Sequence, residues 1–120
     1  MADSKKYQGS CHCGTVKYEV ELDLSGPVLA CNCSMCGRTG ALMTFAPAAQ
    51  FQLQTGEATL TDYQFNTKNI HHLFCATCGV RPFARGTGRD GSPMCMINVR
   101  CLEGVDPTTL EVRHVDGKRL

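Results

Sequence analysis

The stretch that decides the organisation of this chain is Cys31-Asn32-Cys33-Ser34-Met35-Cys36, followed at once by Gly37 and Arg38. It joins a C-x-C spacing to a C-x-x-C spacing through the shared Cys33. In an extended segment, residues i and i+2 point to the same face about 6.6 Å apart, and a tight turn then brings the third cysteine back towards the first two. Glycine adopts positive φ without steric cost, so we expect the chain to leave this turn at Gly37 in that conformation. The three thiols are therefore predicted to meet at one point.

Three thiols that meet at one point favour a metal ion as their partner. Thiolates repel one another unless a cation holds them, and Zn²⁺ binds cysteine sulfur at about 2.3 Å. Zinc with three protein ligands keeps a fourth position for water or substrate, which is typical of a catalytic site. The stretch thus predicts an open zinc site at Cys31, Cys33 and Cys36.

Two more cysteine pairs, each followed by glycine, lie on either side of this stretch: Cys11-x-Cys13 and Cys75-x-x-Cys78. Their spacing allows two arrangements of ligands. In the first, the two flanking pairs form a closed four-thiolate zinc site and the central stretch forms the open one. In the second, only the two C-x-x-C pairs bind zinc, as in a zinc ribbon. The ribbon leaves the first pair and Cys31 without a role, so we favour the first arrangement.

The number of cysteines also indicates metal binding. There are nine, an odd count, and in a reducing compartment such clusters favour metal over a disulfide framework. Cys95 and Cys101 match no metal spacing. They are predicted to be core residues, since free cysteine is among the most buried residue types.

Length and charge limit the classes of protein. The 120 residues are enough for one domain, spanning residues 1–120, that buries roughly two-thirds of its unfolded surface. The net charge of +1, from 12 basic and 11 acidic side chains, gives no footprint for nucleic acid or an anionic membrane surface. No apolar run approaches the ~20 residues of a membrane span, and no signal peptide is recognisable. We therefore expect a cytoplasmic protein with neither nucleic-acid nor membrane partners.

The hydrophobic pattern predicts a mainly β protein, because apolar and polar residues alternate in short segments and no window has sustained helical periodicity. The clearest alternation is in 15–22. The segment 80–93, rich in glycine and proline, is predicted to be a loop with a short strand at Phe83. The predicted strands are 15–22, 28–30, 41–46, 51–54, 60–65, 70–74, 94–101 and 111–115, with one helical turn at 108–110 after an N-cap at Asp106.

Three cysteine motifs in register resemble one known family. They are Gly9-Ser10-Cys11-His12-Cys13-Gly14, Cys31-Asn32-Cys33-Ser34-Met35-Cys36-Gly37-Arg38-Thr39-Gly40 and Phe74-Cys75-Ala76-Thr77-Cys78-Gly79, with the late run Asn98-Val99-Arg100-Cys101-Leu102. In this order the chain resembles the glutathione-dependent formaldehyde-activating enzyme family, which also includes centromere protein V-like proteins. The resemblance implies an Mss4-like fold of several small coiled antiparallel β-sheets with zinc-bound turns. It implies two zinc ions per chain, a structural one on Cys11, Cys13, Cys75 and Cys78 and a catalytic one on Cys31, Cys33 and Cys36.

The same resemblance implies carbon–sulfur lyase chemistry on a small thiol. The reaction would add the thiolate of glutathione to formaldehyde, giving S-(hydroxymethyl)glutathione, or reverse that addition. Zinc held by three thiolates has a net charge of −1 and can still bind an incoming thiol as thiolate, lowering its pKa from about 8.5. Two alternatives stay open. One is a zinc-stabilised binding module without catalysis, and the other is a thiol redox protein that uses metal-free Cys33 and Cys36.

Charged residues beside the motifs have two interpretations each. Arg38 offsets the charge of the open site or holds a substrate carboxylate, or it is a solvated surface residue. One of His71 and His72 could carry protons at the open zinc, but we favour the interpretation in which one packs and the other faces solvent. Arg81 and Arg85 either neutralise the closed site or lie at the surface.

Overall fold

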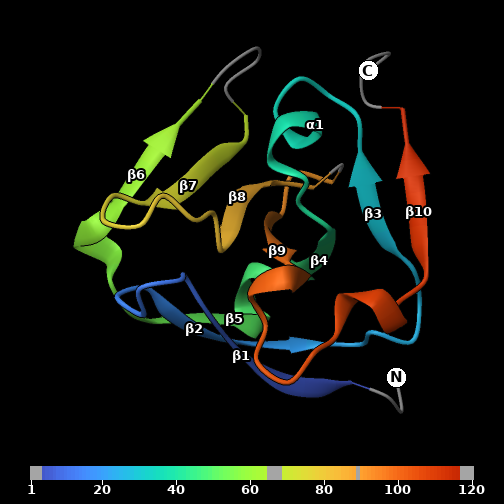
Figure 1. Cartoon of the computed structure of the whole chain (residues 1–120), viewed down its shortest axis with the longest axis horizontal. Coiled ribbons are helices and arrows are strands. Elements are labelled where there is room, and N and C mark those ends of the chain that lie inside the picture. Colours follow the sequence, from blue (N-terminus) through green and yellow to red (C-terminus); the bar gives the residue numbers. More distant parts are fainter. Residues whose placement is uncertain (1–3, 65–68, 89, 117–120) are drawn as a thin grey trace.

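The computed structural model describes residues 4–64, 69–88 and 90–116 (Figure 1). Within these ranges the chain forms ten strands in two sheets, one short α-helix and four 3-10 turns. The prediction of a mainly β protein is therefore confirmed.

The first sheet has three antiparallel strands in the order β1-β2-β5. Their bounds are β1 Lys5–Ser10, β2 Lys17–Leu22 and β5 Phe51–Thr55. Strand β2 has the predicted alternation, because Tyr18, Val20 and Leu22 are buried and the residues between them are not. The sequence does not predict β1, because this edge strand is largely polar and only its Gly9 is buried.

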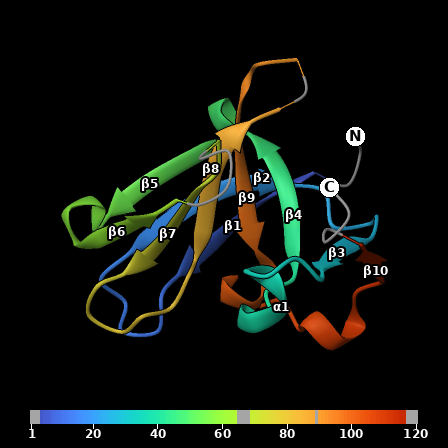
Figure 2. The same cartoon turned by 90° about the horizontal axis from the view of Figure 1, so that it is seen from above.

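The second sheet has seven strands in the order β10-β3-β4-β9-β8-β7-β6. Neighbouring strands run antiparallel except β10 and β3, which are parallel. Helix α1 (Cys36–Thr39) lies at one end of β4 and β9, beside β3 (Figures 1 and 2). The bounds are β3 Val28–Cys31, β4 Met43–Pro47, β6 Leu60–Tyr63, β7 His71–Cys75, β8 Phe83–Thr87, β9 Pro93–Asn98 and β10 Val112–Val115.

The short strand predicted at Phe83 is confirmed as β8, which runs on to Thr87 because β7 and β9 lie on either side of it and pair with it. Another strand prediction is wrong in its extent. The strand predicted to reach Cys101 ends at Asn98. The side chain of Asn98 accepts a hydrogen bond from the N–H of Arg100 at 3.2 Å and begins the 3-10 turn Val99–Cys101.

Two turn predictions have opposite outcomes. The positive φ expected at Gly37 occurs instead at Gly40, with φ +70°, because α1 forms a helical turn that continues through Gly37. The N-cap predicted at Asp106 is confirmed, since its carboxylate accepts from the N–H of Thr108 at 3.0 Å and starts the 3-10 turn Pro107–Thr109. The end of the strand predicted to reach residue 65 lies outside the described residues.

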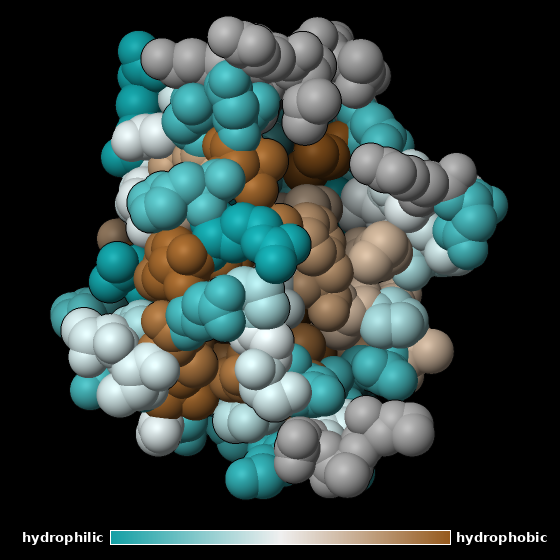
Figure 3. All heavy atoms as spheres, turned by 90° about the vertical axis from the view of Figure 1, so that its right-hand side faces the viewer, coloured by the Kyte–Doolittle hydropathy of each residue, from teal (hydrophilic) through white to brown (hydrophobic). Residues whose placement is uncertain are grey.

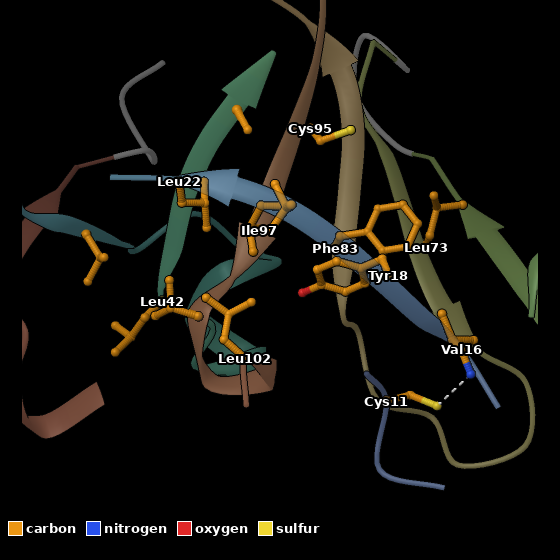
Figure 4. Packing of buried hydrophobic residues seen from close by; sticks show 14 of the residues in the cluster. Cys11, Val16, Tyr18, Leu22, Leu42, Leu73, Phe83, Cys95, Ile97 and Leu102 are labelled. Atoms are coloured by element: carbon orange, nitrogen blue, oxygen red, sulfur yellow. Dashed lines mark hydrogen bonds between the residues drawn. The ribbon is translucent and has the colours of Figure 1, made fainter. Parts of the chain in front are cut away.

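The core lies between the two sheets and centres on three aromatic rings, Tyr18, Phe51 and Phe83, of which Figure 4 labels Tyr18 and Phe83. The ring centroids of Phe51 and Phe83 are 4.6 Å apart, and those of Tyr18 and Phe51 are 5.0 Å apart. The Tyr18 hydroxyl donates to the carbonyl of Pro82 at 3.0 Å, and burial raises its pKa. Because Pro82 lies just before β8, this contact holds the second C-x-x-C turn against β2.

Candidate functional site

Four cysteine sulfurs from two distant turns meet at one end of the core. Cys11 and Cys13 lie between β1 and β2, Cys75 ends β7, and Cys78 lies in the turn that follows. All four Sγ atoms lie within 4.8 Å of one another, and Cys13 Sγ is 3.6 Å from that of Cys11 and 3.7 Å from that of Cys75. A tetrahedral zinc with Zn–S bonds of about 2.3 Å sets its sulfurs about 3.8 Å apart. These separations therefore fit a four-thiolate metal site.

Backbone N–H groups point at the sulfurs of this cluster. The N–H of Val16 donates to Cys11 Sγ at 3.3 Å (Figure 4). Gly79 has φ +80° and turns the chain, so that the N–H of Val80 lowers the pKa of Cys78 to about 6. Hydrogen bonds of this kind stabilise the charged form of a thiol, which is the form that binds metal.

The second cluster is built from the end of β3 and the start of α1. Cys31 is the last residue of β3, Cys36 is the first of α1, and Cys33 lies between them. The three Sγ atoms lie within 4.8 Å of one another. The N–H of Cys33 donates to Cys31 Sγ and that of Cys36 to Cys33 Sγ, each at 3.4 Å. The N–H of Gly37 donates to the carbonyl of Cys33 at 2.8 Å, so it is a helical turn that returns the third thiol. The two C-x-x-C pairs do not come together as a zinc ribbon requires.

Three thiols this close cannot all ionise unless a cation compensates them. Burial, and then the neighbouring Cys33, raise the pKa of Cys36 to about 12. Burial also acts to raise the pKa of Cys33, but the N–H of Cys36 and the neighbouring thiols outweigh it and lower that pKa. A divalent cation would remove this conflict by compensating all three charges, and sulfur donors suit zinc. The residues present therefore fit a zinc ion with three protein ligands.

A cavity of about 490 Å³ opens beside this three-thiol cluster. It is lined by Cys31 and Cys36 together with Asn32, His114 and Asp116. The side chain of Asn32 donates to the carboxylate of Asp116 at 3.1 Å, which ties the cysteine loop to the end of β10. Figure 3 views the molecule from the side of β3 and β10 and shows apolar surface between the polar side chains there. A small molecule in this cavity would meet two of the three thiols directly.

This cavity wall is a feature of the candidate site that sequence reasoning missed. The spacing of the cysteines gives no signal for it, because β10 reaches the site only through its parallel pairing with β3. One weak signal exists in hindsight, since Glu111–Val115 is recognisable as a strand and carries His114. The local sequence pattern does not predict with which strand this segment pairs.

The positions of Arg38, His71 and His72 agree with the structural interpretation of each residue and not with the functional one. Arg38 is exposed, and its Nη1 donates to the carbonyl of Ser34 at 2.9 Å. His71 Nδ1 lies 2.7 Å from the carboxylate of Asp62 at the surface, and His72 is buried. The favoured interpretation of the histidine pair, with one packed and one facing solvent, is therefore confirmed.

Neither of the two late arginines has the predicted place at the closed site. Arg81 is buried, and its Nη1 donates to the hydroxyl of Thr39 at the end of α1 at 3.3 Å. The guanidinium of Arg85 lies 5.2 Å from the centroid of the Phe83 ring. Charge alone could not predict this, because both side chains are placed by the pairing of β8.

The remaining cysteines, Cys95 and Cys101, belong to neither of the two clusters. Cys95 is buried on β9, as predicted. Cys101 is half-buried in a 3-10 turn, its Sγ lies 3.8 Å from the carbonyl of Arg81, and burial raises its pKa to about 11. Neither is among the described groups that could hold a metal ion.

The fold and these clusters together define a class: a mainly β protein with one four-thiol and one three-thiol candidate metal site. The family described as glutathione-dependent formaldehyde-activating enzyme matches residues 6–114, and the chain belongs to this family. A crystal structure of a Rhodobacter sphaeroides protein is similar, with 38% sequence identity and a TM-score of 0.80, over 90% of this chain and 99% of that chain. Among the described residues, no helix has the length and apolar character needed to cross a membrane.

Proposed function

We propose that Cys31, Cys33 and Cys36 hold a catalytic zinc ion and that this site makes or breaks a carbon–sulfur bond of a small thiol. The observation that carries this proposal is the three-thiol cluster at the wall of a cavity, with Cys31 and Cys36 both lining it. A three-ligand site leaves one coordination position for substrate. The four-thiol cluster then holds a second, structural zinc ion.

The family supplies the chemical class of the substrate. Its description names glutathione and formaldehyde, so the proposed product is S-(hydroxymethyl)glutathione. The reaction forms one S–C bond and moves the thiol proton to the aldehyde oxygen, without a change of oxidation state. It is a carbon–sulfur lyase reaction in the reverse direction.

The residues of the site have separate tasks in this proposal. Zinc bound to the three thiolates would favour the thiolate form of the substrate over its thiol. Cys31 and Cys36 face the cavity and so orient the arriving sulfur. Asn32 and Asp116 hold each other across the cavity edge and fix its shape. His114 lines the same cavity and is the proposed carrier of the proton that leaves the thiol and reaches the aldehyde oxygen.

The redox state of the cysteines agrees with this chemistry. All nine cysteines are unpaired, as expected in a reducing compartment, so we propose that the protein acts in the cytoplasm. The partner is then a small thiol of the cell, and the whole 120-residue domain serves to hold the two metal sites.

The test is exchange NMR of glutathione and formaldehyde with S-(hydroxymethyl)glutathione, with and without the protein. The reaction also proceeds without a catalyst, so the measured quantity is acceleration that Cys36→Ser abolishes and that Cys95→Ala, at a buried cysteine outside both clusters, retains. Equal exchange rates with and without protein, together with no binding of thiol, would favour the zinc-stabilised binding module instead.

A further inference from the structure

The side chain of Arg81 is a buried cation with neutral partners. It is 8% exposed. Its Nη1 donates to Thr39 Oγ1 at 3.3 Å, and its Nη2 lies 3.2 Å from Nδ1 of His72. Its Nε is buried without a hydrogen-bond partner. No acidic side chain of the described residues forms an ion pair with it.

His72 does not supply the missing negative charge, since an imidazole is either neutral or positive. Burial, and then the charge of Arg81, lower its pKa, so its ring is neutral at pH 7 and its Nδ1 accepts from the guanidinium. A buried charge is costly unless an opposite charge compensates it. The compensating charge must therefore come from another part of the molecule.

The three-thiol cluster is the neighbouring group that can carry negative charge. The hydroxyl of Thr39 accepts from Arg81 and donates to the carbonyl of Cys36 at 3.4 Å, so one side chain links the guanidinium to a ligand residue. A divalent ion on three thiolates has a net charge of −1, and a fourth thiolate makes it −2.

Arg81 does not lie in the cavity where the substrate is proposed to bind. It lines another hollow of about 490 Å³, which it shares with Met35, Phe74 and Val80 and which contains none of the three thiols. The two cavities have no lining residue in common. The guanidinium is therefore placed to act on the metal centre through α1 and not by touching the substrate.

We propose that Arg81 is the internal counter-cation of the three-thiolate centre. Resting on the proposed function, this makes Arg81 a positioning residue that compensates the charge gained when a substrate thiolate arrives. The charge is supplied by the protein, so the site accepts neutral and anionic thiols alike. Thr39 and His72 hold the guanidinium in place by using two of its five N–H groups.

The test compares native zinc-loaded protein with Arg81→Gln, Arg81→Met and Arg81→Lys. The side chain of methionine is apolar and of similar length, so Arg81→Met buries no polar atom that would need solvation. If Arg81→Gln does not fold, the comparison is made with Arg81→Met. Arg38→Gln is the matched control, because Arg38 is an exposed arginine on α1, the helix that also contains Cys36 and Thr39. Circular dichroism verifies the fold of each variant.

Two quantities are measured. The first is the rate at which a chelator removes the more labile metal ion. The second is the affinity for 2-mercaptoethanol, which is neutral, and for 3-mercaptopropionate, which carries a carboxylate, by NMR titration. Loss of the charge is expected to speed metal release and to lower the affinity for both thiols, each about tenfold. This is the scale of the effect of a nearby unit charge inside a protein. Arg81→Lys is expected to keep metal release and thiol affinity close to those of the native protein, and Arg38→Gln is expected to change neither quantity.

Three results would overturn the proposal. Unchanged metal release and thiol affinity in the neutral variants would show that the charge is irrelevant. A loss confined to 3-mercaptopropionate would make Arg81 a receptor for a substrate carboxylate. If Arg81→Lys changes metal release and thiol affinity as much as Arg81→Met does, the shape and hydrogen bonds of the guanidinium matter and its charge does not. If the native protein binds neither thiol, the proposed function fails, and the metal-release comparison still decides the role of Arg81.

Discussion

Replacing Cys75 by serine is expected to unfold the domain, whereas replacing Cys36 by serine leaves it folded. Cys75 is fully buried, and its cluster joins Cys13 to a residue 62 positions away. The three-thiol cluster spans only residues 31–36. Loop-closure entropy alone makes the long-range cross-link worth about 2 kcal/mol more, from (3/2)RT ln(62/5). Structural zinc sites supply about 10–16 kcal/mol of apparent binding energy, which is as large as the ~5–15 kcal/mol stability of a whole domain.

Circular dichroism melts combined with elemental analysis of zinc measure this difference. Cys95→Ala is the matched control, because Cys95 is equally buried but belongs to neither cluster. We expect an unfolded or strongly destabilised Cys75→Ser, a folded Cys36→Ser with one zinc ion fewer, and a modest loss in the control. If Cys75→Ser melts no lower than Cys36→Ser, the division into a structural and a functional site is wrong.

Three further predictions test other parts of the structure. Native protein should contain two zinc ions per chain and keep one, with its fold intact, after mild chelation, because only the closed site has no vacant position; simultaneous loss of both, seen by elemental analysis, would contradict this. Gly9→Ala should destabilise by about 1–3 kcal/mol, because an added Cβ would lie 2.3 Å from Tyr18 Cζ; Gly26→Ala, with nothing within 4 Å, is the control, and equal denaturation midpoints would refute the packing argument. His72 should titrate below its ordinary value of 6.5 in NMR, because burial and Arg81 disfavour its charged form. Its contribution to stability is then fully present above that value and falls as the pH drops below it, so His72→Gln should show a smaller acid loss of stability than the native protein; a ring that titrates above 6.5 would reverse the sign.

The grouping of the cysteines into two clusters is what the sequence predicts best, because thiol chemistry and short spacing act locally. A C-x-C followed by a turn brings its sulfurs together in almost any surrounding structure. The pairing of Cys11 with Cys75 across the chain was less determined by spacing, since a zinc ribbon would pair Cys75 and Cys78 with Cys33 and Cys36 instead. The resemblance to the family, which rests on the order of the three cysteine motifs, favoured grouping Cys11 and Cys13 with Cys75 and Cys78, and the fold brings these four residues together.

The electrostatic surroundings of the site could not be predicted in the same way. Arg81 and His72 belong to segments whose positions depend on the pairing of β7 with β8. In the sequence, β8 shows only as a short strand at Phe83 among glycine and proline residues, and its pairing partners are not indicated, so the burial of the nearby Arg81 had no visible signal. The helical turn at Cys36 was also missed, because four residues are too few to show a helical period.

The order of the second sheet has a consequence for how binding preferences can diverge among relatives. Strand β10 is one of the two edge strands of the described sheet and pairs on one side only, with β3. Yet it contributes His114 and Val115 to the cavity wall, facing ligands that come from an entirely different segment. Substitutions on this one margin can reshape the cavity while every sulfur ligand stays in place. On the proposed function, the sulfur chemistry and the shape of the cavity are thus encoded in separate parts of the chain. His114 is the exception on β10, because it is the proposed proton carrier, so the other positions of this strand can vary at less cost to reactivity.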